Sequence, residues 1–210
     1  AGYALTDSFA AITGATDAVI NAAGDLTEDN AVITVANAVT LNNYSNTGST
    51  SYELEDAIGT MLAASSATVA GATKASLTAG AITVDQAAAV VAKYTAAVFA
   101  DANLIISDTA ANLAAMSAEV AAEASSITVS AGTATVAEAV ALDAFAATDA
   151  STVDISDTMA NLTAGASDAA TLAILGAQAG IALSNASSVE DILALNALLA
   201  NSGGAQTAIA

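Results

Sequence analysis

One short sequence motif returns four times along the chain at a nearly constant interval. Each occurrence is an apolar–x–apolar alternation that ends in Asp, and another apolar residue follows five positions after that Asp. The occurrences begin at residues 3, 52, 104 and 153, so they are 49, 52 and 49 residues apart. Such a period is typical of repeat architectures, in which stacked units share a thin continuous core. The terminal Asp residues are Asp7, Asp56, Asp108 and Asp157, and the apolar residues after them are Ile12, Met61, Leu113 and Leu162.

A second, weaker motif lies between these occurrences. It covers residues 33–35, 82–84, 127–129 and 181–183, which begin 49, 45 and 54 residues apart. We interpret both motifs as strands, so the predicted unit is a double one, strand–helix–strand–helix. Four such repeats fill the chain as a single array, at about residues 3–51, 52–103, 104–152 and 153–210.

The spacing of the motifs indicates the fold class. Each predicted strand is only three to five residues long, and its apolar residues alternate as they do when one face is buried. The segments between the motifs are rich in alanine and are predicted as helices, for example residues 7–23, while residues 24–30 are predicted as a turn. Short strands separated by helices favour parallel pairing. We therefore predict an α/β fold, a repeat solenoid of alternating short parallel strands and Ala-rich helices, with a closed eight-stranded barrel as the alternative.

The charge balance excludes whole classes of partner. The chain has 21 Asp and Glu residues against two Lys, with no Arg and no His, and its net charge is −19. Nucleic-acid binding needs basic residues that replace the counterions of the phosphates, so we expect no nucleic-acid partner. We also expect no membrane insertion, because polar residues interrupt residues 169–189, an apolar stretch that carries no charge. The acidic groups of such a chain repel one another unless cations screen them. We therefore expect divalent cations as candidate ligands.

The residue types that usually perform catalysis are scarce. His and Cys are absent, and we expect Lys74 and Lys93 each to lie in an alanine-rich helix. We therefore predict no enzyme, no catalytic residue and no cofactor-binding residue. Because the chain begins at Ala1 without an initiator Met or a basic leader, we expect that it is processed or excised from a longer protein. The remaining carboxylate groups, at Glu53, Glu55 and Asp56 and at Glu190 and Asp191, are expected to be solvated surface charge.

The four recurring Asp residues have two interpretations. Asp directly before a helix is a favoured N-cap, whose carboxylate accepts hydrogen bonds from free backbone amides and faces the positive end of the helix dipole. Alternatively, Asp7, Asp56, Asp108 and Asp157 form a ladder that binds calcium through hard oxygen ligands. The acidic segment at residues 25–29 has the same two interpretations. The N-cap is the favoured one, and calcium is the only cofactor that the sequence suggests.

Two of the occurrences carry a family resemblance. Residues 106–113 read Ile-Ser-Asp-Thr-Ala-Ala-Asn-Leu, and residues 155–162 read Ile-Ser-Asp-Thr-Met-Ala-Asn-Leu. They resemble the Asp-Thr-Ala-Ala-Asn-Leu repeats of large secreted bacterial surface proteins, which include adhesins, surface-layer proteins and matrix proteins. The resemblance implies an extracellular or cell-surface location and a structural role, and it carries over no catalytic residue. Asn112 and Asn161 would either stack as a ladder or satisfy turn amides; the equivalent Asn is missing after Asp7 and Asp56.

These observations lead to one functional expectation and one alternative. We expect an extracellular structural protein that self-assembles into a filament, surface layer or matrix through stacking of its repeat ends, as a homo-oligomer or polymer. The alternative is a binding or spacer module of a large adhesin, with a glycan or, with less support, ice as its target. An ice-binding face needs a regular array of Thr, and only Thr34, Thr83 and Thr128 align within the second motif.

Overall fold

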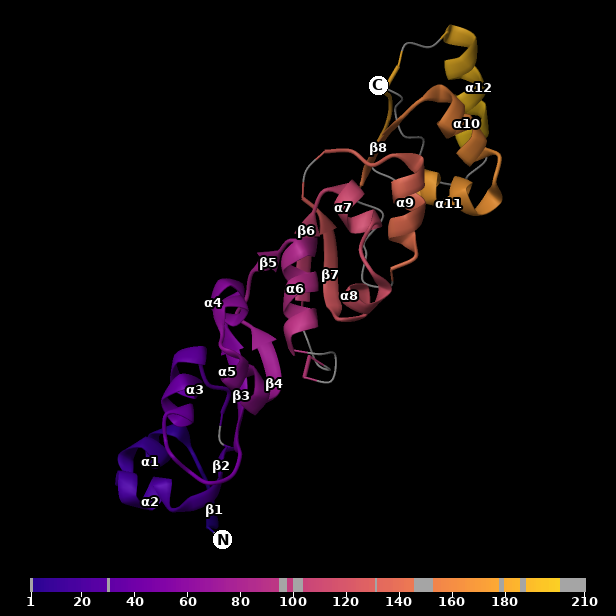
Figure 1. The fold of residues 1–210 in the computed structure, drawn as a ribbon. Helices are drawn as coiled ribbons and strands as arrows, with labels where there is room; N and C mark the ends of the chain where they lie inside the picture. The colour runs from indigo at the N-terminus through magenta and orange to yellow at the C-terminus, as the bar shows by residue number, and fades with distance from the viewer. Residues whose placement is uncertain are drawn as a thin grey trace. The chain divides into compact units, whose positions relative to one another are not determined.

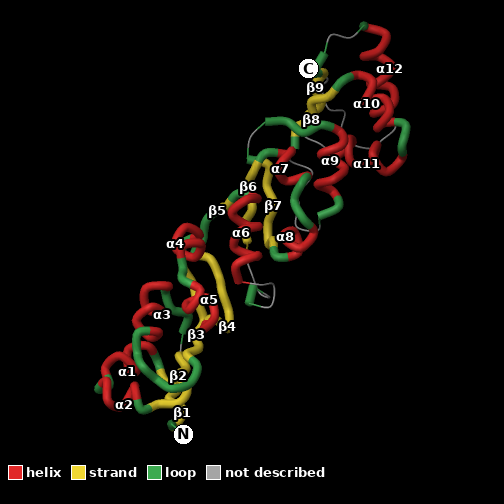
Figure 2. Tube along the Cα trace, in the orientation of Figure 1, coloured by secondary structure: helices red, strands yellow, loops and turns green. Residues whose placement is uncertain are grey.

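The computed structural model of the chain describes residues 2–29, 31–94, 98–99, 104–130, 132–145, 153–177, 180–185 and 188–200. Within these residues the protein is an α/β structure with parallel strands and twelve helices (Figures 1 and 2). The contacts divide the chain into two halves, Ala1–Leu104 and Ile105–Ala210. Each half is described by itself.

The first half contains a four-stranded parallel sheet whose strands follow one another in chain order. The order is β1–β2–β3–β4. Leu5 lies opposite Leu26, Leu26 lies opposite Thr50, and Leu54 lies opposite Ala75. The strands are β1 (Tyr3–Asp7), β2 (Ala23–Glu28), β3 (Thr50–Asp56) and β4 (Ala72–Leu77), and β5 (Ala81–Ile82) follows them.

Helices connect these strands in two alternating ways. A pair of very short helices joins β1 to β2 and β3 to β4, whereas one longer helix joins β2 to β3. Because all the strands are parallel, every connection must return along the sheet, and a helix suits that path. The pairs are α1 (Phe9–Gly14) with α2 (Asp17–Asn21) and α4 (Ile58–Ala63) with α5 (Ser66–Gly71), and the longer helices are α3 (Val35–Asn42) and α6 (Val84–Tyr94).

The second half contains the same kinds of element. Strand β6 lies beside β7, and β8 pairs in parallel with β9, Ile155 opposite Ile181. The strands are β6 (Leu104–Asp108), β7 (Ala124–Val129), β8 (Asp154–Asp157) and β9 (Gly180–Leu183). The helices are α7 (Ala110–Ala114), α8 (Ala118–Ala122), α9 (Val136–Asp143), α10 (Met159–Ala166), α11 (Ala169–Ala177) and α12 (Val189–Leu199).

The core is thin, and it uses the apolar positions of the first motif. Leu54, Ile106 and Ile155 are buried in their strands, and the apolar residue five positions after each Asp is buried as well. Ala38, Ala87 and Ala139 are also buried, which allows α3, α6 and α9 to approach the strands closely. Such packing needs few large side chains.

Two predicted elements are wrong. Residues 7–23 do not form one helix, because the backbone is extended at Ala15 and Thr16 and separates α1 from α2. Residues 24–28 are not a turn but most of strand β2, which has β1 on one side and β3 on the other. Gly, Asp and Glu are poor strand formers, so pairing on both sides overrides the local preference here. Asn30, at the end of the predicted turn, lies outside the described residues.

The four copies of the second motif do not occupy equivalent positions in the fold. Ile33 makes a single parallel bridge to Leu54 and is followed at once by helix α3, and Ile82 likewise precedes α6. Residues 127–129 and 181–183 instead lie in the strands β7 and β9. The structural counterpart of Ile33 and Ile82 is Ala134, which bridges Ile155. These three positions are 49 and 52 residues apart, the interval of the first motif.

Two further predictions have clear outcomes. Lys93 lies in helix α6 as predicted, but Lys74 lies in strand β4. The strands of the first half form an open sheet in chain order, so the described strands do not form the eight-stranded barrel that was the alternative topology.

Candidate functional site

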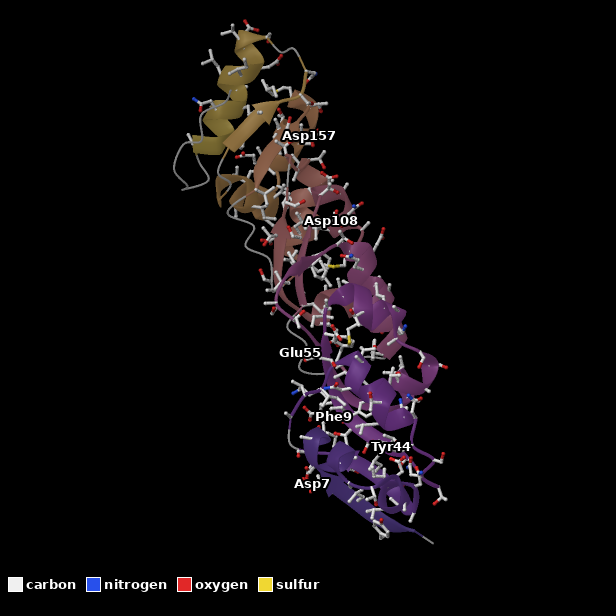
Figure 3. The ribbon with its side chains drawn as sticks, turned by 90° about the vertical axis from the view of Figure 1, so that its left-hand side faces the viewer. Asp7, Phe9, Tyr44, Glu55, Asp108 and Asp157 are labelled. Carbon is white, nitrogen blue, oxygen red and sulfur yellow. The ribbon has the colours of Figure 1, made fainter. Side chains whose placement is uncertain are left out.

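The four recurring Asp residues end the strands β1, β3, β6 and β8. Figure 3 labels three of them, Asp7, Asp108 and Asp157. In each case the Oδ1 atom accepts the backbone N–H of the next residue, at 2.7–2.8 Å. That next residue, not the Asp, is the helix N-cap, and Ser8, Thr109 and Thr158 use their side-chain oxygens for this purpose. The N-cap prediction for Asp7, Asp56, Asp108 and Asp157 is therefore wrong by one position.

The second carboxylate oxygen reaches a different helix. The Oδ2 atom of Asp56 accepts the N–H of Val35 at 3.1 Å, and the Oδ2 atom of Asp157 accepts the N–H of Val136 at 3.0 Å. Val35 and Val136 are the first residues of α3 and α9, whose N–H groups have no partner inside the helix. Each carboxylate thus joins the start of one helix to the start of the helix that follows its own strand. We call Asp56 and Asp157, with these bonds, the Asp clasps.

The Asn of the family-like motif contacts the same carboxylates. The Nδ2 atom of Asn112 donates to Oδ1 of Asp108 at 2.8 Å, and that of Asn161 donates to Oδ1 of Asp157 at 2.7 Å. Neither the stacked ladder nor the turn-amide interpretation anticipated this bond. The spacing explains it, because residues four apart at the start of a helix lie on one face.

Asp157 is almost buried, with 6 % of its surface exposed. Burial acts to raise the pKa of its carboxyl group. The hydrogen bonds from Val136, Asn161 and Thr158 outweigh that effect, and the pKa lies below its ordinary value of 3.8. The carboxylate is therefore kept charged by N–H donors rather than by a cation of the chain.

The calcium ladder is not supported as a preformed site. The four Asp residues end four different strands, and their Oδ1 atoms already accept N–H groups. Among the described residues no group of three or more acidic, His or Cys side chains is arranged to hold a metal ion. Calcium binding stays a prediction, and any site at these residues would need ligands beyond the Asp side chains.

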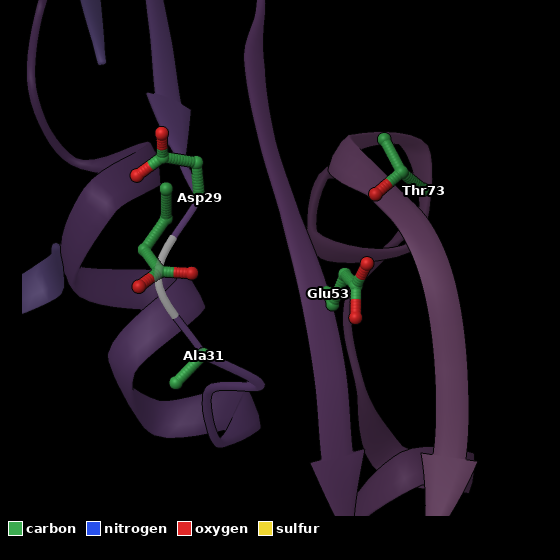
Figure 4. A pocket seen from close by; sticks show the side chains of 5 residues that line it. Asp29, Ala31, Glu53 and Thr73 are labelled. Atoms are coloured by element: carbon green, nitrogen blue, oxygen red, sulfur yellow. The ribbon is translucent and has the colours of Figure 1, made fainter. Parts of the chain in front are cut away.

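An acidic cleft of about 340 Å³ lies in the first half (Figure 4). Glu28, Asp29, Ala31, Glu53 and Thr73 line it. Glu28 is only 5 % exposed; its Oε1 atom accepts the N–H of Phe9 at 3.4 Å, and its Oε2 atom has no partner. Burying a carboxylate oxygen without a hydrogen bond lowers the free energy of unfolding, so Glu28 destabilises the fold locally. The acidic segment at residues 25–29 was recognised from the sequence, but the burial of Glu28 was not, because β2 was predicted as a turn.

The predicted acidic segment at residues 25–29 is divided by this arrangement. Asp25 does not line the cleft. Its Oδ1 atom accepts the backbone N–H of Ser49 at 2.9 Å and the Ser49 hydroxyl at 2.8 Å. These two bonds lower the pKa of the Asp25 carboxyl group. Asp25 therefore ties β2 to the segment before β3.

Other charged groups that the sequence singled out also have structural partners. The ammonium group of Lys93 donates to the carbonyl oxygens of Leu62 and Ala64, at the end of helix α4. A cation at this place is favourable, because the last carbonyls of a helix lack partners and carry partial negative charge. Asp191 accepts the backbone N–H and the hydroxyl of Ser188 at the start of α12. A carboxylate oxygen of Glu55 accepts the Ser76 hydroxyl at 3.4 Å.

A second hollow, a shallow groove of about 480 Å³, lies beside the Asp157 clasp in the second half. Its lining is mainly apolar and comes from α9 and α10, with Asp168, just before α11, and Thr171 of α11 beside them. The Asp157 carboxylate borders it, but both of its oxygens already accept hydrogen bonds within the chain. A ligand in this groove would therefore make mainly apolar contacts and would find no free carboxylate oxygen at Asp157.

Comparisons with protein-family models, with curated proteins and with solved structures found no match to this chain. No helix of the described residues is both long and apolar enough to span a bilayer. The function must therefore be inferred from the geometry of the chain. The two Asp clasps are the feature that recurs in both halves.

Proposed function

We propose that this chain is an extracellular structural protein whose four repeats form an α/β solenoid, and that it self-assembles into a filament, surface layer or matrix through stacking of repeat ends. It acts without catalysis, and its partner is a further copy of itself. The extracellular location rests on the resemblance of residues 106–113 and 155–162 to repeats of secreted bacterial surface proteins.

The observation that carries the proposal is a join between neighbouring repeats that occurs in both halves. In the first half Ile33 bridges Leu54, and the Val35 N–H donates to Asp56. In the second half Ala134 bridges Ile155, and the Val136 N–H donates to Asp157. A join that relies on backbone pairing and one carboxylate can be repeated along a chain, which supports a solenoid built by addition of like units.

The hydrogen-bond partners of the polar groups support a structural role. The recurring Asp residues, Asp25, Asp191 and Lys93 all bond to backbone groups at helix or strand ends. Side chains held in this way fix local geometry, whereas catalysis needs groups that are directed at a substrate. Parallel strands in chain order also leave an edge at which pairing can continue.

The test is the state of association of the purified chain. Light scattering and negative-stain electron microscopy, over a range of protein concentration and with calcium or a chelator, should show particles that grow with concentration. Salt should favour growth, because the net charge of −19 opposes contact between molecules. A monomer under all of these conditions would favour the spacer module of an adhesin instead.

A further inference from the structure

Glu28 is a buried carboxylate at a position that is apolar elsewhere in the fold. It lies opposite Asp7 in the register of β1 and β2. The residues that lie opposite the Asp clasps in the same way are Leu77 in β4 and Leu183 in β9, and both are half-buried. An aliphatic side chain therefore suits this place in the sheet, and the fold itself does not need a carboxylate there.

The Glu28 carboxylate is also weakly held. Its Oε1 atom accepts the N–H of Phe9 at 3.4 Å, which is longer than most hydrogen bonds, and its Oε2 atom has no partner. Because the last torsion of a Glu side chain is soft, the carboxylate can turn toward the cleft at the cost of this one long bond. Carboxylate oxygens that are buried without a partner are rare in folded proteins, and a ligand that donates to Oε2 would remove the cost.

The cleft supplies further acceptors from neighbouring strands. Figure 4 shows Asp29 on one side and Glu53 and Thr73 on the other, and all three are exposed. The Thr73 hydroxyl donates to the carbonyl oxygen of Tyr52 at 3.1 Å, so its own oxygen keeps lone pairs for a donor in the cleft. Lys74 lies opposite Glu53 in the strand register, so its ammonium group can balance one of the three carboxylates. The lining as a whole stays negative.

We propose that this cleft binds a guanidinium group, with the carboxylates of Glu28 and Glu53 as its acceptors. A guanidinium group has five N–H donors in a planar fork, so it can reach carboxylates from β2 and β3 together. A metal ion needs several oxygen ligands around one point, and the described acidic side chains form no such group. The 210 residues contain no Arg, so the guanidinium group belongs to a partner, and the site does not rest on the proposed self-assembly.

Titration calorimetry at physiological salt tests the site with three probes. These are a short end-blocked peptide with a single arginine, the same peptide with citrulline in its place, and agmatine. Citrulline has nearly the shape of arginine but no charge, so the arginine peptide should bind at least tenfold more tightly. Agmatine carries the guanidinium group without peptide groups: affinity equal to that of the peptide indicates a small guanidine compound as the ligand, and weaker affinity indicates an arginine of a partner protein. Equal binding of the arginine and citrulline peptides would overturn the inference.

Charge-matched variants separate the cleft from general attraction to an acidic protein. Glu28→Gln removes one negative charge from the cleft, and Asp17→Asn removes one from the exposed start of α2, outside the cleft. Binding of the arginine peptide should weaken about tenfold in Glu28→Gln and stay unchanged in Asp17→Asn. Equal weakening in the two variants would overturn the inference.

A third variant, Glu28→Leu, introduces the residue type that β4 and β9 have at this position. It should abolish binding of the arginine peptide and move the midpoint of urea denaturation to a higher concentration, because the unpaired buried oxygen is removed. A midpoint that moves to a lower concentration would show that Glu28 serves the fold rather than a ligand, and would also overturn the inference.

Discussion

Tyr3 in β1 and Tyr52 in β3 show what a strand gains from the elements on its outer side. Both hydroxyls donate to a backbone carbonyl oxygen sixteen residues later, Tyr3 to Val19 and Tyr52 to Thr68. Tyr52 also accepts a hydrogen bond of 2.8 Å from Nδ2 of Asn42, which belongs to helix α3 of the first repeat. The bond within the repeat is thus the same, and the burial of the ring depends on the neighbour.

The difference teaches that β1 and β3 have the same local structure but are covered to different extents by neighbouring elements. Local sequence determines the strand, the short helix pair and the tyrosine bond in both repeats. The preceding repeat adds the bridge from Ile33, the bond from Val35 and the contact with Asn42. Equivalent substitutions in β1 and in a strand that is better covered, such as β3 or β8, should therefore have unequal effects.

The largest difference is expected for leucine at the centre of the strand. Leu54→Ala should lower the free energy of unfolding by about 2–5 kcal/mol, because it leaves a cavity in a closed core. Leu5→Ala should cost clearly less, since Leu5 is only half-buried. Urea denaturation followed by circular dichroism measures both. Equal losses would mean that β1 is as well covered as β3 in solution.

The next difference is expected for the carboxylates. Asp157→Ala leaves the N–H groups of Val136 and Thr158 without an acceptor in a buried place, so the free energy of unfolding should fall by about 1.5–3 kcal/mol. Asp7→Ala should cost the monomer less, because Asp7 is exposed. A larger loss in Asp7→Ala would contradict the role given to the clasp.

The pH dependence of stability should follow the same carboxylate. The folded pKa of Asp157 lies below 3.8, so its contribution is present above that pH and is lost as the pH falls through the lowered value. Acid titration of the free energy of unfolding should therefore show a steeper loss in the wild type than in Asp157→Asn, which cannot titrate there. Parallel curves for the two proteins would show that the pKa of Asp157 is not lowered in the folded chain.

The smallest difference is expected for the tyrosine hydroxyls. Tyr52→Phe removes the acceptor of Asn42 and the donor to the Thr68 carbonyl, and should cost about 1 kcal/mol. Tyr3→Phe should cost less, because water replaces the lost partner at an exposed position. Thermal unfolding compares the two variants. The prediction fails if the exposed tyrosine proves the more sensitive one.

The sequence predicted the features that depend on local pattern. The period of about 50 residues, the strands that end in Asp and the buried apolar residue five positions later all follow from spacing. Strand β2 could not be found in this way, since Ala-Gly-Asp-Leu-Thr-Glu is a turn-like sequence that becomes a strand only between two neighbours. The burial of Glu28, which belongs to the acidic segment at residues 25–29, was not predicted for the same reason.

The Asp clasps could not be predicted from the sequence either, because they join residues that are far apart in the chain. The bond from Asp to the next N–H is local, whereas the bond from Val35 to Asp56 joins residues 21 apart, and so does the bond from Val136 to Asp157. No spacing rule for a single helix covers such a pair. A Thr-Val pair recurs at residues 34–35, 83–84 and 135–136, and it marks these helix starts. The second motif, as predicted, matched residues 33–35 with residues 127–129 and so did not include residues 135–136.

The chain order of the strands also has a consequence for how the protein forms. Tyr3 pairs with Ala23, Leu26 with Thr50, and Tyr52 with Ala72, so every strand of the first half finds its partner within about half a repeat along the chain. Low contact order of this kind shortens the search that precedes folding. During synthesis each strand can pair soon after it emerges, and the growing end needs no distant segment to arrive. Folding of the sheet in the first half can therefore proceed strand by strand in chain order.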